Sequence, residues 1–239
     1  MKKHIPNLIT LLNLSSGMIA IFFIFQKDWL WAAGFVLLGI FFDFFDGLAA
    51  RYFKVSSEMG LQLDSLADMV TSGVAPAFAM FFLLQDALGV DLSEGIYLDA
   101  NHLLPFFGFA IALGSALRLA KFNIDERQTG SFIGLPTPAN TLFILSLPLI
   151  VYHQNIESLK QLILNPYTLI IISLFSAYIL NAEMPLFSLK FKNFTWKDNA
   201  EKYILIILSL ILIPLFQFVS IPIIIIIYLL LSLYLKFKK

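Results

Sequence analysis

Long apolar stretches repeat along nearly the whole chain, and they constrain its fold more than any other feature. Each is close to the ~20 residues that a helix needs to cross the hydrocarbon core of a bilayer. We place these stretches at residues 8–25, 29–45, 64–84, 103–120, 138–152, 166–181, 203–218 and 221–235. Because backbone polar groups inside a bilayer must be satisfied within the protein, such stretches predict helices. The sequence therefore predicts an all-α polytopic membrane bundle of about eight transmembrane helices.

Composition supports a membrane protein and excludes several other classes. Hydrophobic residues make up 59% of the 239 residues and charged residues 13%, against ~45–50% and ~25% in soluble domains. There is no cysteine, which excludes disulfides, thiolate metal sites and cysteine nucleophiles. The formal net charge is zero, so nothing in the charge favours a nucleic-acid partner.

The distribution of positive charge predicts the orientation of the bundle. With eight spans both termini lie on one side, and most Lys and Arg fall there, among them Arg51, Lys54 and Lys121. Lys27 and Lys160 fall on the other side. Because positively charged connections stay in the cytoplasm, we expect cytoplasmic termini and a location in the cytoplasmic membrane of a prokaryote.

The same pattern gives the expected domain organisation. Residues 1–239 are predicted to form one integral membrane domain. Within it we expect a catalytic six-helix core over 1–181, a cytosolic connection over 182–202 and a C-terminal helical pair over 203–239.

Four aspartates occur where the second predicted span ends and the third begins. Asp43 and Asp46 are three residues apart and Asp64 and Asp68 four apart, so each pair shares one face of a helix. Clustered carboxylates repel one another unless they are protonated or bridged by cations. An all-oxygen set suits Mg²⁺ or Mn²⁺, and such ions commonly bind phosphate as well. A charged surface loop is the alternative, which the apolar neighbours Phe41–Phe45 argue against.

Small and basic residues follow the first acidic pair. Gly47 and Ala50 continue the helical face of Asp43 and would open a groove beside a metal, and Arg51 offers a fork of donors for phosphate. Together with Gly60 the pattern reads D-x2-D-G-x2-A-R-x8-G-x3-D-x3-D. This pattern resembles the signature of the CDP-alcohol phosphotransferase family.

The resemblance implies specific roles for these residues. The four aspartates would bind two divalent cations, Mg²⁺ or Mn²⁺, and Asp68 would also act as the general base toward the acceptor hydroxyl. The CDP site would be lined by Gly47, Ala50, Arg51 and Gly60. Asn7 and Thr10 share a face of the first span with Asn13. They would either contact the nucleotide or form capping and interhelical hydrogen bonds.

Two further segments bear on the acceptor alcohol. R-L-A-K-F-N at 118–123 and G-L-P-T-P-A at 134–139 resemble the membrane-embedded phosphatidylserine synthases within the family. That resemblance implies transfer of a phosphatidyl group from CDP-diacylglycerol to L-serine, with release of CMP. Arg118 would bind the serine carboxylate, with Asn123 and Lys121 beside it. The alternative for Arg118 is a helix-end cation that reaches toward the interface.

Other readings stay open at this point. Another acceptor such as glycerol 3-phosphate or inositol phosphate would use the same donor site. A membrane transporter with intramembrane aspartates is an alternative of a different class, and it predicts carboxylates near the bilayer midplane. The resemblance also implies a homodimer surrounded by membrane lipid. The donor's tails, diacyl or archaeal ether, and the choice between Mg²⁺ and Mn²⁺ are not determined by these residues.

Overall fold

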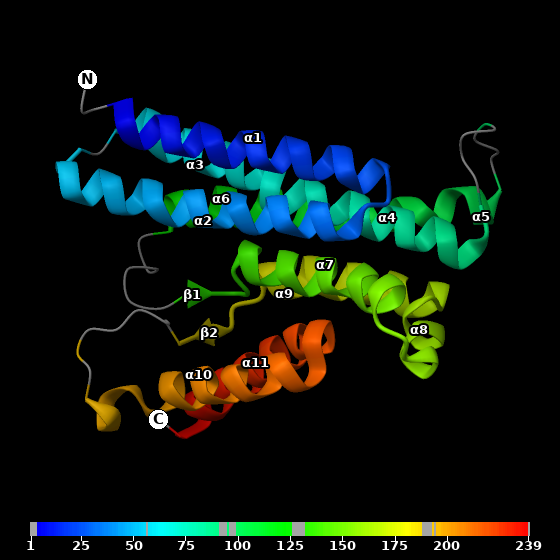
Figure 1. Ribbon diagram of the computed structural model, residues 1–239. Helices are drawn as coiled ribbons and strands as arrows, with labels where there is room; N and C mark the ends of the chain where they lie inside the picture. Colours follow the sequence, from blue (N-terminus) through cyan, green and yellow to red (C-terminus); the bar gives the residue numbers. More distant parts are fainter. Residues whose placement is uncertain are drawn as a thin grey trace.

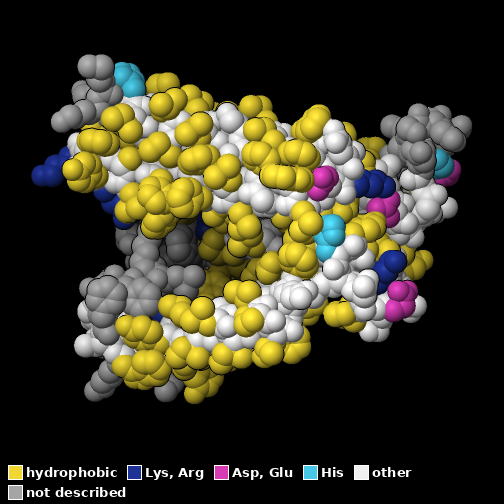
Figure 2. Space-filling view, in the orientation of Figure 1, with side chains coloured by type: hydrophobic (Ala, Val, Ile, Leu, Met, Phe, Trp, Pro, Cys, Tyr) yellow, Lys and Arg dark blue, Asp and Glu magenta, His cyan; other side chains and the backbone are white. Residues whose placement is uncertain are grey.

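The architecture is a bundle of helices that run back and forth along one direction (Figure 1). The computed structural model describes residues 4–55, 57–90, 95, 99–125, 132–187, 193 and 195–238. The two ends of the chain lie at the same end of the bundle (Figure 1). On the face shown in Figure 2, apolar side chains cover the middle of the molecule and most charged ones gather at its two ends. This confirms the predicted all-α polytopic membrane bundle.

Two long helices open the chain and pack along their lengths. Helix α1 (Ile5–Phe25) buries a stripe that is polar and small near its start and apolar toward its end. Helix α2 (Trp29–Phe53) begins at Asp28, whose side chain accepts a hydrogen bond from the Trp31 amide. It continues past the predicted end at residue 45, because its backbone ladder runs on to Lys54, whose left-handed conformation ends the helix.

The third helical segment is continuous but changes its winding. It consists of α3 (Glu58–Asp68), the π-helical turn η2 (Met69–Val74) and α4 (Ala75–Leu88). The Ser57 side chain caps its start by accepting a hydrogen bond from the Gly60 amide at 3.0 Å. The helix therefore begins before the predicted position 64, and the second acidic pair is helical throughout.

The remaining elements complete the bundle. They are α5 (Ala100–Leu103), the 3-10 helix η4 (Leu104–Phe109), α6 (Ala110–Ile124), α7 (Thr137–His153), α8 (Glu157–Ile163), α9 (Pro166–Asn181), α10 (Trp196–Phe216), the 3-10 turn η6 (Gln217–Val219) and α11 (Ser220–Lys238). Two short strands, β1 (Phe132–Ile133) and β2 (Pro185–Leu186), pair in antiparallel fashion, with Phe132 opposite Leu186. This pairing was not expected from the sequence.

The number of membrane crossings depends on how bent segments are counted. Five helical segments among the described residues are long and apolar enough to cross a membrane, or six if the bent pair α8 and α9 forms one span. The prediction of about eight is higher for two reasons. The segment 199–235 contains both α10 and α11, which pack against each other (Figure 1), and α7 is short at 17 residues.

The core surrounds α4 and α7, which carry much of the buried apolar surface. The C-terminal pair joins this core through α11, which packs against α7 and β2. There the Tyr228 hydroxyl donates to the Phe187 carbonyl at 2.9 Å. The predicted connection over 182–202 contains β2 and the first two turns of α10, and residues 188–192 and 194 lie outside the described residues. The division at 181 and 203 stays a prediction.

Candidate active site

Three of the four predicted aspartates come together between the C-terminal half of α2 and α3. Each of Asp43, Asp46 and Asp64 contributes one carboxylate oxygen, and these three oxygens lie within 4.8 Å of one another. Only a short connection separates the two helices, and their acidic faces turn toward each other closely enough to bring these oxygens together. The spacing of three residues in α2 keeps Asp43 and Asp46 on one face, as the sequence predicts.

The surroundings of this cluster fit a divalent cation. Asp46 is buried and accepts a hydrogen bond from the Thr10 hydroxyl at 2.6 Å. The Oδ1 atom of Asp64 is buried and has no hydrogen-bond partner among the described residues. Two oxygens bound to one Mg²⁺ lie at most about 4.2 Å apart, so small side-chain rotations would close the cluster around an ion. A hard cation would satisfy the unpartnered oxygen and offset the repulsion between carboxylates.

Asp68 lies one helical turn beyond Asp64 and is not part of the three-oxygen group. Its Oδ1 accepts a hydrogen bond from Asn13 Nδ2 on α1 at 3.1 Å. Asp68 is also the last residue of α3 before the π-helical turn. The structure thus gives Asp68 a different environment from that of the other three aspartates.

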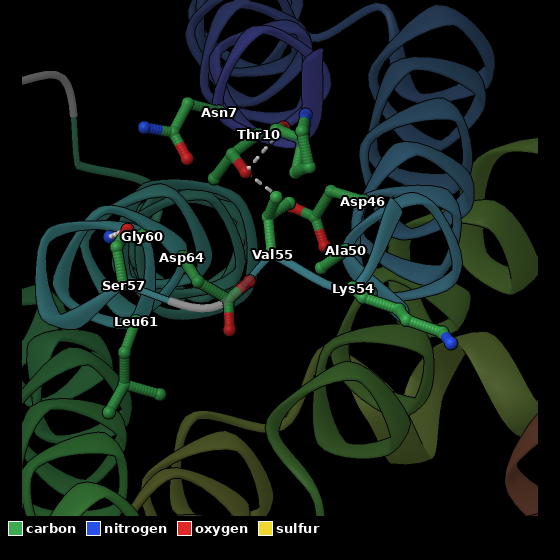
Figure 3. Close-up of a pocket in the computed structure, with 12 residues that line it drawn as sticks. Asn7, Thr10, Asp46, Ala50, Lys54, Val55, Ser57, Gly60, Leu61 and Asp64 are labelled. Carbon is green, nitrogen blue, oxygen red and sulfur yellow. Dashed lines mark hydrogen bonds between the residues drawn. The ribbon is translucent and has the colours of Figure 1, made fainter. Parts of the chain in front are cut away.

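A cavity of about 560 Å³ opens beside the cluster (Figure 3). Asp46 and Asp64 extend into the same space from α2 and α3, while the Lys54 side chain extends away from it (Figure 3). The cavity is lined by Pro6, Asn7, Thr10, Asp46, Gly47, Ala50, Lys54, Val55, Ser57, Gly60, Leu61 and Asp64. Most of the residues assigned to a CDP site therefore share one cavity.

Arg51 is the exception among the residues predicted to bind CDP. It is exposed, and its Nε donates to the Gly47 carbonyl of its own helix at 3.0 Å. It does not line the cavity. A change of rotamer would be needed for its guanidinium to reach a phosphate there.

A second cavity, of about 360 Å³, lies at the end of α6. It is lined by Arg118, Lys121, Ile124, Asp125, Ile133, Leu180, Asn181 and Glu183. Arg118 is only 5% exposed and lies 5.5 Å from the ring centroid of Phe122. Its Nε donates to the Leu135 carbonyl at 3.3 Å, the one acceptor that it reaches among the described residues. The remaining guanidinium donors are left for a bound anion.

Asn123, the third residue predicted to bind serine, does not line the second cavity. Its side chain exchanges hydrogen bonds with the Ser65 hydroxyl at 2.9 and 3.2 Å. Ser65 follows Asp64 directly in α3. Asn123 therefore joins the helix of the second cavity to the helix of the acidic cluster.

Several residues that line the cavities were not anticipated. Asp125 and Glu183 add two carboxylates to the second cavity, and Ser57 and Lys54 line the first. Ser57 has a local signal, because serine is a preferred residue immediately before a helix. Asp125 and Glu183 follow the ends of two predicted spans on the same side of the membrane, a weaker signal that only the pairing of helices makes specific.

Comparison with known proteins adds an independent line of evidence. The family model for CDP-alcohol phosphatidyltransferases matches residues 3–185. The chain belongs to this family. The match covers all the candidate site residues and ends near β2, so the C-terminal pair lies beyond it.

Three curated relatives to which the chain is similar carry the name CDP-diacylglycerol–serine O-phosphatidyltransferase. The protein from Bacillus subtilis is 38% identical over 140 residues, which cover 57% of this chain and 70% of that protein. The protein from Helicobacter pylori is 30% identical over 210 residues, 86% of this chain and 80% of that protein. The protein from Methanocaldococcus jannaschii is 31% identical over 160 residues, 67% of this chain and 68% of that protein.

Proposed function

We propose that this chain transfers the phosphatidyl group of CDP-diacylglycerol to L-serine and releases CMP, as a step of phospholipid synthesis. The observation that carries the proposal is the group of three carboxylates within 4.8 Å beside a cavity lined by the residues of the family pattern. The names of the relatives indicate the same donor and acceptor. A transporter would need carboxylates near the middle of the bundle, whereas Asp46 and Asp64 lie about two helical turns from the connection between α2 and α3.

The metal site in this proposal consists of Asp43, Asp46, Asp64 and Asp68, and it takes two divalent cations, Mg²⁺ or Mn²⁺. When bound, such ions hold the diphosphate and offset the charge that develops on the leaving CMP. Thr10 holds Asp46 in place through its hydrogen bond of 2.6 Å. The unpartnered Asp64 Oδ1 is the oxygen most in need of a ligand.

The first cavity is the proposed CDP site. Gly47 and Ala50 present little side-chain bulk on the α2 side, and Gly60 does the same on α3, so a nucleotide can approach both helices. Asn7 and Thr10 supply polar groups from α1. Arg51 reaches the diphosphate after it releases the Gly47 carbonyl. The lipid tails extend sideways over the apolar surface, and with cytoplasmic termini the reaction takes place at the cytosolic leaflet of a prokaryotic cytoplasmic membrane.

The second cavity is the proposed serine site, and its charges suit an amino acid. Arg118 and Lys121 offer positive groups for the carboxylate, while Asp125 and Glu183 offer negative groups for the ammonium. Among the described residues that line this cavity two carry a positive and two a negative charge, whereas a phosphorylated alcohol would favour an excess of positive charge. The observation therefore favours serine over glycerol 3-phosphate or inositol phosphate. Asn123, bonded to Ser65, ties this site to the acidic cluster rather than binding serine directly.

The chemical step in the proposal is a direct displacement. The serine hydroxyl oxygen forms a bond to the β-phosphorus of CDP-diacylglycerol as the bond from that phosphorus to the CMP oxygen breaks. Asp68 accepts the hydroxyl proton. Phosphatidylserine and CMP leave, and the resemblance further suggests that two copies of the chain act as a homodimer.

The test is CMP release by the purified protein in detergent with CDP-diacylglycerol and either Mn²⁺ or Mg²⁺. We expect release that depends on L-serine and that EDTA stops. Glycerol 3-phosphate and inositol phosphate serve as competing acceptors. Release with one of these but not with serine would overturn the acceptor assignment while leaving the donor site intact. No release with any acceptor from protein that binds CDP-diacylglycerol would overturn the enzyme assignment.

A further inference from the structure

The π-helical turn η2, which directly follows Asp68 in the chain, carries buried polar side chains. Such turns are rare and are found frequently at functional sites. Thr71 and Ser72 of this turn are both buried. The Ser72 carbonyl accepts a hydrogen bond from the Thr141 hydroxyl at 2.8 Å and lies 3.5 Å from the Ser115 hydroxyl. Helices α6 and α7 thereby hold the turn from one side.

Helix α1 holds the turn from the other side, through a chain of hydrogen bonds that leads to Asp68. The Thr71 hydroxyl donates to Asn13 Oδ1 at 2.8 Å. Asn13 Nδ2 in turn donates to Asp68 Oδ1 at 3.1 Å. Because the amide oxygen of Asn13 receives the Thr71 hydroxyl, its NH₂ group is the part that faces Asp68. Thr71 thus determines the orientation of the amide, and the amide holds the carboxylate.

Two glycines provide the space that this chain of hydrogen bonds occupies. A Cβ atom added to Gly17 of α1 would lie 2.3 Å from Thr71 Oγ1. A Cβ atom added to Gly39 of α2 would lie 2.7 Å from Thr71 Cγ2 and 2.9 Å from Asn13 Oδ1. All three distances are too short for real contacts of a Cβ atom. The absence of a side chain at Gly17 and Gly39 therefore leaves room for the Asn13–Thr71 pair between α1, α2 and the π-helical turn.

We propose that Asn13 and Thr71 are positioning residues for Asp68. They hold its carboxylate by Oδ1 and leave Oδ2 to take the proton of the acceptor hydroxyl. Among the described residues, Asn13 is the hydrogen-bond donor that Asp68 has. A neutral amide fixes the carboxylate without adding a positive charge beside the metal site. This inference rests on the proposed role of Asp68 as the base.

The test compares two substitutions at one position. Thr71→Val keeps the shape of the side chain and removes the hydroxyl, while Thr71→Ser keeps the hydroxyl. We expect kcat for CMP release to fall about tenfold in Thr71→Val, because a small misplacement of a catalytic group is costly. Thr71→Ser should stay within about twofold of wild type, and KM for CDP-diacylglycerol and serine should stay within about twofold in both.

A second variant and a control make the test independent of one mutant's folding. Asn13→Asp keeps the size of the side chain but places an oxygen against Asp68, so kcat should fall at least as far as in Thr71→Val. Ser15→Ala is the matched control, because it removes an α1 hydroxyl that bonds only to the Leu11 carbonyl of its own helix among the described residues. It should leave kcat unchanged.

Mn²⁺ affinity, measured by electron paramagnetic resonance, separates positioning of the base from support of the metal site. We expect it to be unchanged in Thr71→Val. A tenfold loss of Mn²⁺ affinity, an equal loss of kcat in Thr71→Ser, or a lower melting temperature with normal kcat would each overturn the proposal. If wild type releases CMP with another alcohol only, the serine assignment fails and the series is run with that alcohol. Release with no alcohol overturns both proposals.

Discussion

At the scale of single residues, four aspartates of identical chemistry have different surroundings. Asp46 accepts a hydrogen bond from the Thr10 hydroxyl, and Asp68 accepts one from the Asn13 amide. The buried Oδ1 of Asp64 has no hydrogen-bond partner in the part of the chain that the structure describes. One carboxylate oxygen of each of Asp43, Asp46 and Asp64 lies within 4.8 Å of the other two, and Asp68 is not part of this group. This difference supports the proposal that Asp68, besides its place in the metal site, is the aspartate that accepts the proton.

Asp68→Asn tests the role of the base. The amide cannot accept the acceptor's proton, so we expect turnover to fall by roughly 10²-fold or more, while binding of CDP-diacylglycerol is largely retained. Glu58→Gln is the matched control, since Glu58 is an exposed carboxylate in the same helix. CMP release and lipid binding are the measurements. Normal turnover in Asp68→Asn would remove Asp68 as the base.

Arg118→Ala tests the serine site. Loss of a charge-assisted hydrogen bond to the carboxylate should raise the serine KM by about tenfold or more, because such bonds contribute ~1.5–3 kcal/mol. The KM for CDP-diacylglycerol should change much less. Lys160→Ala, at the opposite end of the bundle, is the control. An unchanged serine KM in Arg118→Ala would contradict the assignment.

At the scale of elements, the wall of the second cavity is held by the β1–β2 pairing and the residues next to it. The Gly134 amide donates to the Met184 carbonyl at 2.9 Å, and the Leu135 amide donates to the Ile179 carbonyl at 3.1 Å. Leu135 also supplies the carbonyl that holds Arg118. These hydrogen bonds hold the segment before α7 against the end of α9. Because Arg118 bonds to the Leu135 carbonyl of that segment, they also hold Arg118 at the edge of the cavity.

Gly134→Ala tests the contribution of this hydrogen-bonded segment to stability. Gly134 has φ of +76°, and a Cβ there would lie 2.4 Å from the Leu180 carbonyl oxygen. Gly89→Ala is a closely matched control, because Gly89 has φ of +64° and open space around it. Both variants bear the strain of the left-handed region, about 1 kcal/mol, but only Gly134→Ala adds the clash. We expect a clearly larger fall in melting temperature for Gly134→Ala, and equal falls would contradict this account.

At the scale of the whole molecule, both cavities lie near the end of the bundle where the chain begins and ends (Figure 1). The opposite end is joined by side chains from distant segments. Asp86 of α4 accepts hydrogen bonds from Lys27 and from Tyr152 of α7. Gln154 accepts from the Val219 amide at 3.1 Å and donates to the Phe216 carbonyl at 3.0 Å, which secures the turn between α10 and α11.

The predicted orientation can be tested directly because the chain has no cysteine. Glu58→Cys marks the end with the acidic cluster, and Ser158→Cys in α8 marks the opposite end; both residues are exposed. With cytoplasmic termini, a membrane-impermeant maleimide should label only Ser158→Cys in intact cells. Glu58→Cys should react after permeabilisation. The reverse pattern would contradict the orientation inferred from Lys and Arg.

The amino-acid sequence by itself determined the features that depend on neighbours along the chain. Apolar length predicted the helices, and spacings of three and four residues predicted that each acidic pair shares a face. The order of Asp, Gly, Ala and Arg identified the family that the comparison then confirmed. These properties are local, so they can be read without knowing how the helices pack.

Only the tertiary structure decided which distant residues meet. Asn13 and Thr71 are 58 residues apart, and only packing of α1 on the π-helical turn brings them together beside Asp68. The charged residues of the second cavity come from α6 itself and from the residues that follow α6 and α9, and the pairing of β1 and β2 joins these segments. Helix ends, too, were set by Lys54 and Ser57 rather than by hydropathy. Such contacts depend on the three-dimensional packing of whole helices, which local spacing does not encode.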